Sequence, residues 1–106
     1  MSTEGQGLAV HLGGMVEFAH GGIVSKAVAE NEAFKVILFC IEAGQELSEH
    51  TASAPATIQV LQGKAAVVVG DQAYEAVPGA FYAMPAHLPH SVRATEDLVF
   101  LLVMGA

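Results

Sequence analysis

The sequence predicts an all-β domain of antiparallel strands, arranged as a sandwich or a barrel. Short segments rich in Val, Ile, Phe and Leu recur along the 106 residues, and Gly, Pro, Asn or Asp separate them. Hydrophobic residues make up 53% of the chain and charged residues 14%, a composition that favours a packed globular domain over disorder. A chain of this length is expected to form one domain.

Nine segments are predicted as strands, and polar or glycine-rich residues connect them. His20, Gly21 and Gly22 form a loop between the first two segments. Residues 28–34 also tolerate a helix, but that helix would be short, and residues 30–32 fit a turn between two strands equally well. The predicted strands are residues 15–18, 24–28, 34–41, 57–61, 65–69, 73–77, 81–84, 90–94 and 98–104.

Three tight turns support this antiparallel arrangement. Gly70 can take a positive φ at the first central position of a two-residue turn, so residues 65–69 and 73–77 are predicted to pair as a hairpin. Gly63 and Lys64 make a second turn between two strands. Pro78 and Gly79 make a third, in which Pro sets φ and Gly supplies the left-handed position.

Charge and hydropathy exclude several classes of function. The net charge is −7, so the chain repels phosphate backbones, and we expect no nucleic-acid partner. The longest apolar runs, residues 36–41 and 98–104, are far shorter than the roughly twenty residues that span a bilayer, so no membrane association is expected. Residues 1–14 lack the basic start and apolar stretch of a secretory signal, which predicts a cytoplasmic protein.

The cysteine content and the size of the chain add two expectations. Cys40 is the single cysteine, so it cannot form an internal disulfide, and its apolar surroundings in sequence predict a buried thiol in a reducing compartment. A chain of this size buries only roughly two thirds of the surface that its unfolded form exposes. We therefore expect a homodimer, formed by strand exchange or by sheet packing.

Two segments, residues 44–63 and 79–90, resemble the paired motifs of the cupin family. In the first motif, Gly44, His50 and Gly63 stand at the family's spacing. The family's second His falls on Ala52 and its Glu on Ala56, so two of the four usual metal ligands are absent. The resemblance covers about residues 15–104, and it identifies the chain as a small single-domain cupin with an incomplete set of metal ligands.

The second motif is kept more fully. Gly79, Pro85 and His90 lie at the expected intervals, whereas His87 replaces the family's Gly and Ala94 its terminal Asn. The resemblance implies an antiparallel double-stranded β-helix, or jelly-roll barrel. Residues 1–14 are then expected to form an N-terminal arm, and residues 15–106 the barrel domain.

His50 and His90 are the candidate metal ligands that the resemblance implies. Transition metals in proteins usually have three or more protein ligands, so two imidazoles need a further donor. Glu46 shares the parity of His50 and could face the same cavity if the strand is regular, and His87 could turn inward from its loop. No tightly bound cofactor is expected; the alternatives are a divalent transition metal at low occupancy, a metal-free cavity, or histidines hydrogen-bonded in the wall.

Exchange of two ligands for Ala makes the predicted barrel interior more apolar, which favours a small organic ligand there. The alternative is that Phe39, Phe81, Tyr82 and Met84 fill this space. The predicted ligand pocket consists of His50, Ile58, Val60, Tyr82, Met84 and His90.

Three functions follow from these expectations. The first is a small-molecule binding module with a degenerate metal site. The second is a metal-dependent dioxygenase or isomerase that uses His50, His90 and a non-standard third ligand. The third is an interaction protein with a filled barrel that presents a dimer surface.

Overall fold

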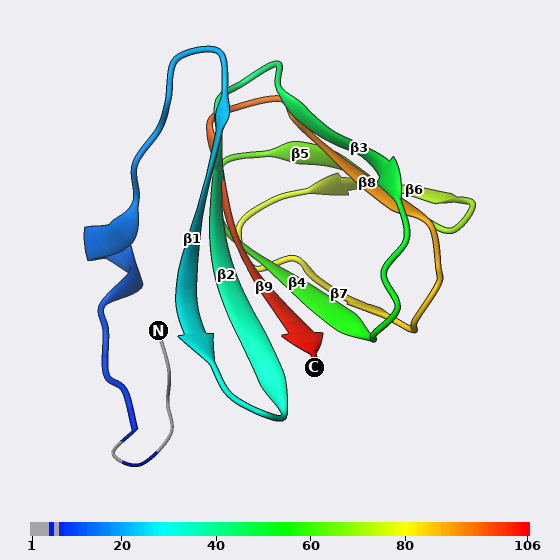
Figure 1. Ribbon diagram of the computed structural model, residues 1–106. Coiled ribbons are helices and arrows are strands. Elements are labelled where there is room, and N and C mark those ends of the chain that lie inside the picture. The colour runs from blue at the N-terminus through cyan, green and yellow to red at the C-terminus, as the bar shows by residue number, and fades with distance from the viewer. Residues whose placement is uncertain (1–4, 6) are drawn as a thin grey trace.

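The computed structural model describes Gly5 and residues 7–106, and it contains nine strands in two antiparallel sheets (Figure 1). The five-stranded sheet has the order β1-β2-β9-β4-β7, and the four-stranded sheet has the order β3-β8-β5-β6. The all-β jelly-roll prediction is therefore confirmed. The elements are a 3-10 helix η1 (Leu12–Met15) and strands β1 (Ile23–Glu30), β2 (Phe34–Ile41), β3 (Glu46–His50), β4 (Ala56–Gln62), β5 (Ala65–Val69), β6 (Gln72–Ala76), β7 (Phe81–Met84), β8 (His90–Ala94) and β9 (Leu98–Gly105).

Eight of the nine predicted segments correspond to strands, with small differences at their ends, and the first segment is wrong. Residues 15–18 form the end of η1 and an irregular stretch, because their apolar side chains pack onto a sheet without pairing to a strand. The strand missing from the prediction is β3, which carries Glu, Ser and His in place of β-forming residues.

The connection between β1 and β2 is a turn and not a helix. The Asn31 Oδ1 atom accepts hydrogen bonds from the backbone N–H groups of Ala33 and Phe34, at 2.8 and 2.9 Å. An Asn side chain that bonds its own backbone two residues onward replaces the hydrogen bonds that a helix would need.

The core lies between the two sheets, where alternate residues of each strand face inward. On β4, for example, Ala56, Ile58 and Val60 are buried while the residues between them are more exposed. The rings of Phe39 and Phe100 stack with their centroids 4.9 Å apart and an interplanar angle of 9°. These inward side chains leave little free space in the barrel.

A second apolar cluster lies on the outward face of the five-stranded sheet. Its buried members are Val28, Leu38, Cys40 and Val99, and the N-terminal segment covers it with side chains that include Leu12 and Met15. The Cys40 thiol is 0% exposed, as the sequence predicts. Residues 1–4 and 6 of the predicted arm lie outside the described residues.

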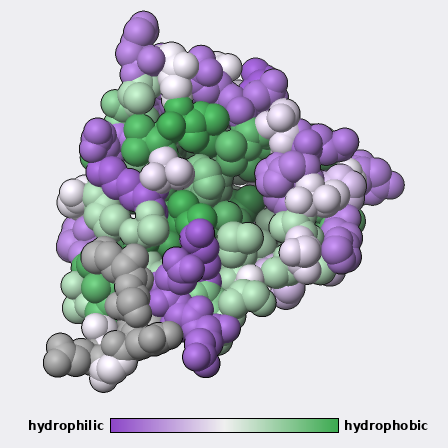
Figure 2. Space-filling model, viewed as in Figure 1, coloured by the Kyte–Doolittle hydropathy of each residue, from purple (hydrophilic) through white to green (hydrophobic). Residues whose placement is uncertain are grey.

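The two sheets differ in the polarity of their outward faces. The outward residues of β2, β9, β4 and β7 include no charged side chain. They include Phe34, Val36, Leu38, Cys40, Val99, Leu101, Val103, Gly105, Thr57, Gln59, Leu61, Phe81 and Ala83. In contrast, one outward row of the four-stranded sheet contains Glu46, Arg93 and Glu75. Figure 2 shows hydrophobic side chains gathered in the upper middle of the visible face, with hydrophilic ones along its top and right-hand side and in a strip that runs from the centre to the bottom. No helix among the described residues is long and apolar enough to span a membrane.

Candidate functional site

The two motif histidines meet inside the barrel, on neighbouring strands. His50 is the last residue of β3 and His90 is the first residue of β8, and the two residues are register partners in the four-stranded sheet. Their ring centroids are 4.2 Å apart with an interplanar angle of 64°. His90 is 6% exposed, whereas His50 is exposed, so the pair connects the interior to solvent.

A β-bulge directs His50 inward. Leu47 pairs with the inward-facing Val92, and a regular strand would then place Glu49 opposite His90. The register shifts between Leu47 and His50, so His50 takes that position. A bulge adds one residue to one strand and re-aims the side chains that follow it.

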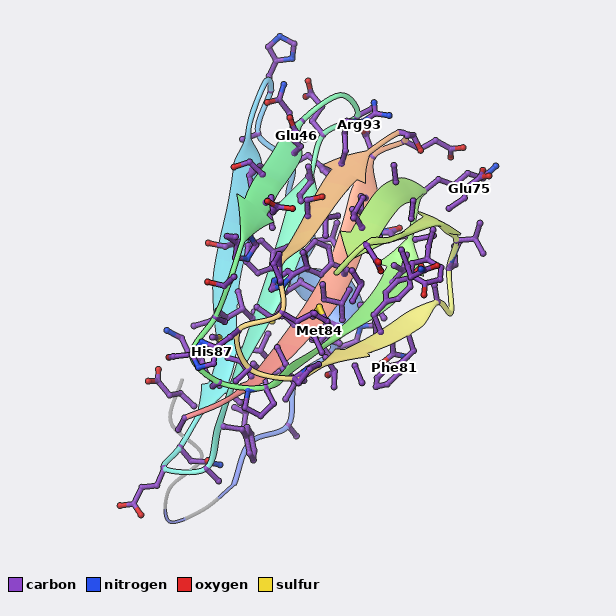
Figure 3. The ribbon with its side chains drawn as sticks, turned by 90° about the vertical axis from the view of Figure 1, so that its right-hand side faces the viewer. Glu46, Glu75, Phe81, Met84, His87 and Arg93 are labelled. Carbon is purple, nitrogen blue, oxygen red and sulfur yellow. The ribbon has the colours of Figure 1, made fainter. Side chains whose placement is uncertain are left out.

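The bulge also overturns the prediction that Glu46 could complete a metal site. That prediction required a regular strand, but Glu46 pairs with Arg93 and lies on the outward face, one residue before the inward-facing Leu47. Figure 3 shows Glu46 and Arg93 together at one end of the barrel. The carboxylate of Glu46 therefore faces away from the two imidazoles.

His87 does not join the pair either. It is exposed in the turn before β8, with a φ of 70°, and its backbone N–H donates to the Ala52 carbonyl at 2.7 Å. Figure 3 places His87 at the opposite end of the barrel from Glu46. The positive φ also explains why the family has glycine here, since this backbone region favours glycine.

Each imidazole is held by a backbone carbonyl two residues earlier in the chain. The Nδ1 atom of His50 lies 2.9 Å from the Ser48 oxygen, and that of His90 lies 3.0 Å from the Leu88 oxygen. A carbonyl oxygen only accepts hydrogen bonds, so both Nδ1 atoms carry a proton. In the neutral rings, both Nε2 atoms are therefore left with a lone pair.

The histidines line a cavity of about 40 Å³, and its other walls are apolar. A water molecule needs roughly 10–15 Å³ of cavity volume, so the cavity has room for about three atoms or groups of the size of water. Its lining residues are Phe39, Leu47, His50, Ile58, His90, Val92, Phe100 and Leu102. The cavity therefore admits the end of a small molecule, and Phe39 and Phe100 occupy much of the remaining interior.

The predicted pocket residues fall into two groups. His50, Ile58 and His90 line the cavity together. Val60 and Met84, 2% and 3% exposed, are packed in the core, and Tyr82 packs against that core with its ring 5.3 Å from the ring of Tyr74. Burial, and to a lesser extent Tyr74, raises the pKa of Tyr82. Whether any of these residues contacts a ligand stays a prediction.

The sequence-based pocket did not include Leu47, Val92, Phe100 and Leu102. Alternation along β9 is a signal that could have identified Phe100 and Leu102, because Leu98, Phe100 and Leu102 share one face. Leu47 could not be identified in this way, because the bulge that follows it breaks the alternation of β3.

The donor set does not fit a tightly bound transition metal. Among the described residues, no group of three or more His, Cys, Asp or Glu side chains is arranged to hold a metal ion. Cys40 is on the outward face of β2 and cannot contribute. Two imidazoles supply fewer ligands than the three that catalytic zinc and iron sites usually have.

Two larger hollows have no titratable side chain in their walls. One of about 460 Å³ includes Pro55, Thr57, Ala83 and Val103 in its lining. The other, of about 450 Å³, lies between the N-terminal segment and the outward face of the five-stranded sheet. They are larger than the histidine cavity, and their walls are mostly apolar.

Comparisons with known proteins agree with this architecture. Residues 37–104 match the model of a family described as the cupin domain. An RmlC-like cupin protein from Desulfovibrio desulfuricans is 35% identical, with 85% of this chain and 88% of that chain covered and a TM-score of 0.77. A cupin superfamily protein from Desulfitobacterium hafniense DCB-2 is 24% identical, with 95% and 93% covered and a TM-score of 0.84.

One similar structure is an enzyme. A mutant of salicylate 1,2-dioxygenase from Pseudoaminobacter salicylatoxidans is 17% identical, with 79% of this chain and 26% of that chain covered and a TM-score of 0.72. At this identity the likeness concerns the fold alone. No protein with a curated description matches this chain.

Proposed function

This chain belongs to the cupin domain family, and from that premise we propose that it binds a small molecule at the cavity of His50 and His90 without a tightly held metal ion. One observation supports this proposal above the others. Two imidazoles, each fixed by a backbone carbonyl, line an otherwise apolar cavity that reaches solvent. A few polar groups that converge in an apolar pocket are typical of a ligand site.

The size of the cavity sets how the ligand binds. Complete enclosure of a drug-sized molecule takes roughly 300–1,000 Å³, whereas this cavity has about 40 Å³. The ligand therefore places one small end between the histidines, and the rest of it lies past His50, which is the exposed member of the pair.

The metal-dependent alternative is tested directly by metal analysis. We expect the protein, expressed in medium that contains Fe, Mn, Ni, Zn and Cu and then dialysed without chelator, to retain far less than one ion per chain. Titration of a fragment collection is expected to shift the imidazole resonances of His50 and His90 in NMR spectra. In His50→Ala the shift of the remaining His90 resonance should be lost, whereas His87→Ala should preserve the shifts of both His50 and His90, because His87 lies outside the cavity.

The opposite pattern would assign a metal enzyme instead. Retention of one ion per chain through dialysis, with loss of that ion in His50→Ala and not in His87→Ala, contradicts the proposal. Such a metal site would need a further ligand, because the described His, Cys, Asp and Glu side chains do not form a group of three.

We also propose that two copies associate through the part of the outward face of the five-stranded sheet that the N-terminal segment does not cover, around Thr57, Ala83 and Val103. The chain carries a net charge of −7, yet the outward residues of β2, β9, β4 and β7 carry no charge. Two such faces can meet without burying a charge, which would be costly. The neighbouring 460 Å³ hollow, which includes Val103, adds apolar surface that a second copy would cover.

Sedimentation velocity tests this association. Val103→Glu places a charge on the proposed interface and is expected to convert the dimer to a monomer. Val68→Glu is the matched control. Val68 is a half-buried valine on the four-stranded sheet, and its side chain faces outward because the neighbouring residues 67 and 69 face inward. A monomeric wild-type protein, or an equal effect of both substitutions, contradicts the proposal.

A further inference from the structure

The Nε2 atoms of His50 and His90 determine which ligand groups can form hydrogen bonds in the cavity. Both Nδ1 protons are used by the Ser48 and Leu88 carbonyls, so in the neutral rings the Nε2 atoms of His50 and His90 can only accept hydrogen bonds. The side chains therefore present two acceptors and no donor to a ligand. The ring centroids are 4.2 Å apart, so one ligand end can lie against both imidazoles.

The His90 Nε2 atom is not completely enclosed, although the residue is buried, with 6% of its surface exposed. Its only side-chain hydrogen bond is made through Nδ1. Within the described part of the chain, no fully buried side-chain nitrogen or oxygen lacks a hydrogen-bond partner. The His90 Nε2 atom is therefore not fully buried. The open space next to the His90 side chain is the cavity that it lines.

When both imidazoles are neutral, the cavity walls supply no group that attracts an anion. The other six lining residues are all apolar, and Arg93, which neighbours Val92 on β8, faces outward opposite Glu46. The chain as a whole carries a net charge of −7. A carboxylate in this cavity would place its lone pairs against those of two imidazoles, with no cation nearby.

We infer that the cavity selects ligands whose inserted end donates hydrogen bonds and carries no negative charge, that is, a hydroxyl or an amine on a small apolar body. This inference rests on the proposed function, because it concerns the same cavity. A ligand with two or more donor hydrogens, such as a vicinal diol (two) or a primary ammonium group (three), can donate to both Nε2 atoms at once. The apolar body then contacts Leu47 and Phe39.

The first test is the tautomer of the free protein. Nitrogen-15 imidazole spectra at a pH of about 8, where imidazole is ordinarily neutral, distinguish a protonated from an unprotonated ring nitrogen. We expect Nδ1–H with unprotonated Nε2 for both His50 and His90. A proton on Nε2 of either residue in the free protein overturns the inference, whatever ligand later binds.

The second test compares four small probes by the same resonances. Ethane-1,2-diol and ethylammonium donate hydrogen bonds, 1,2-dimethoxyethane only accepts them, and acetate is an anion. Probes of this size bind with dissociation constants on the order of millimolar. We expect the two donors to bind about tenfold or more tightly than the other two, because an unpaired acceptor in an apolar site is costly. The stronger of the two donors then assigns the ligand as a hydroxyl or an amine.

His50→Phe keeps a ring at the cavity but removes one acceptor, so it is expected to weaken binding of ethane-1,2-diol by about tenfold. His87→Phe is the matched control and should leave binding unchanged. If acetate binds at least as tightly as the donors, the inference fails while the proposed function stands. If none of the probes shifts either histidine and the protein retains a metal ion, both fail.

Discussion

Gly63→Ala is expected to lower the free energy of unfolding by about 3 kcal/mol or more, a large part of the stability of a small domain. Gly63 connects β4 and β5 with a φ of +83°. A Cβ atom there would overlap the carbonyl oxygen of Asp97 and lie 2.9 Å from the Cα atom of Leu98. Both obstacles are backbone atoms at the start of β9, and Leu98 is 0% exposed, so the overlap can be relieved only by moving a central strand.

Gly79→Ala is the matched control for this prediction. Gly79 also has a positive φ, +94°, but an added Cβ atom would have no neighbour within 4 Å. It should therefore lose only the backbone preference, about 1–2 kcal/mol. Urea unfolding followed by circular dichroism measures both variants, and equal losses for the two would show that the contact with Asp97 does not carry the effect.

Phe100→Ala is expected to cost about 3–5 kcal/mol, the range for removal of a buried aromatic side chain. Phe100 is 1% exposed, stacks on Phe39, and lines the histidine cavity. Its removal should therefore join a new apolar space to the existing cavity. Phe81→Ala is the control, because Phe81 is 59% exposed and its loss should cost less than about 1 kcal/mol.

The enlarged cavity gives this prediction a second measurement. An apolar space left by a lost side chain can bind a molecule such as benzene, and a ligand that binds only the folded state raises its stability. Benzene should therefore raise the unfolding midpoint of Phe100→Ala and leave the wild-type protein and Phe81→Ala unchanged. If Phe100→Ala is destabilised but benzene has no effect, the neighbouring side chains have closed the space.

The strands were predictable wherever local chemistry and burial agree. Residues 34–41, 65–69, 81–84 and 90–94 were predicted with the bounds that the structure has. The first three are rich in β-branched or aromatic residues, and turn residues bound all four. Residues 15–18 also contain apolar side chains but form no strand, because Met15 and Val16 cover the cluster around Leu38 and Val99 on the sheet's outward face. Apolar composition predicts burial in both cases, and only the available hydrogen-bond partners distinguish a strand from a covering segment.

The candidate site was predicted in part. The spacing of two motifs identified His50 and His90, and the structure brings their rings together. The same spacing could not exclude Glu46, because side-chain parity holds only for a regular strand and β3 contains a bulge. Nor could it show that Val60 and Met84 are packed in the core while Phe100 lines the cavity.

By itself, the sequence determined the all-β architecture, the family, and the presence of two histidines without the family's other ligands. These properties depend on residue type, periodicity and spacing, which are local along the chain. The tertiary structure alone decided that the bulge turns His50 inward, that two backbone carbonyls hold the imidazoles, and that the cavity is only about 40 Å³. Those properties depend on how strands distant in sequence are registered and packed, and packing volume is a sum over many side chains that no single motif encodes.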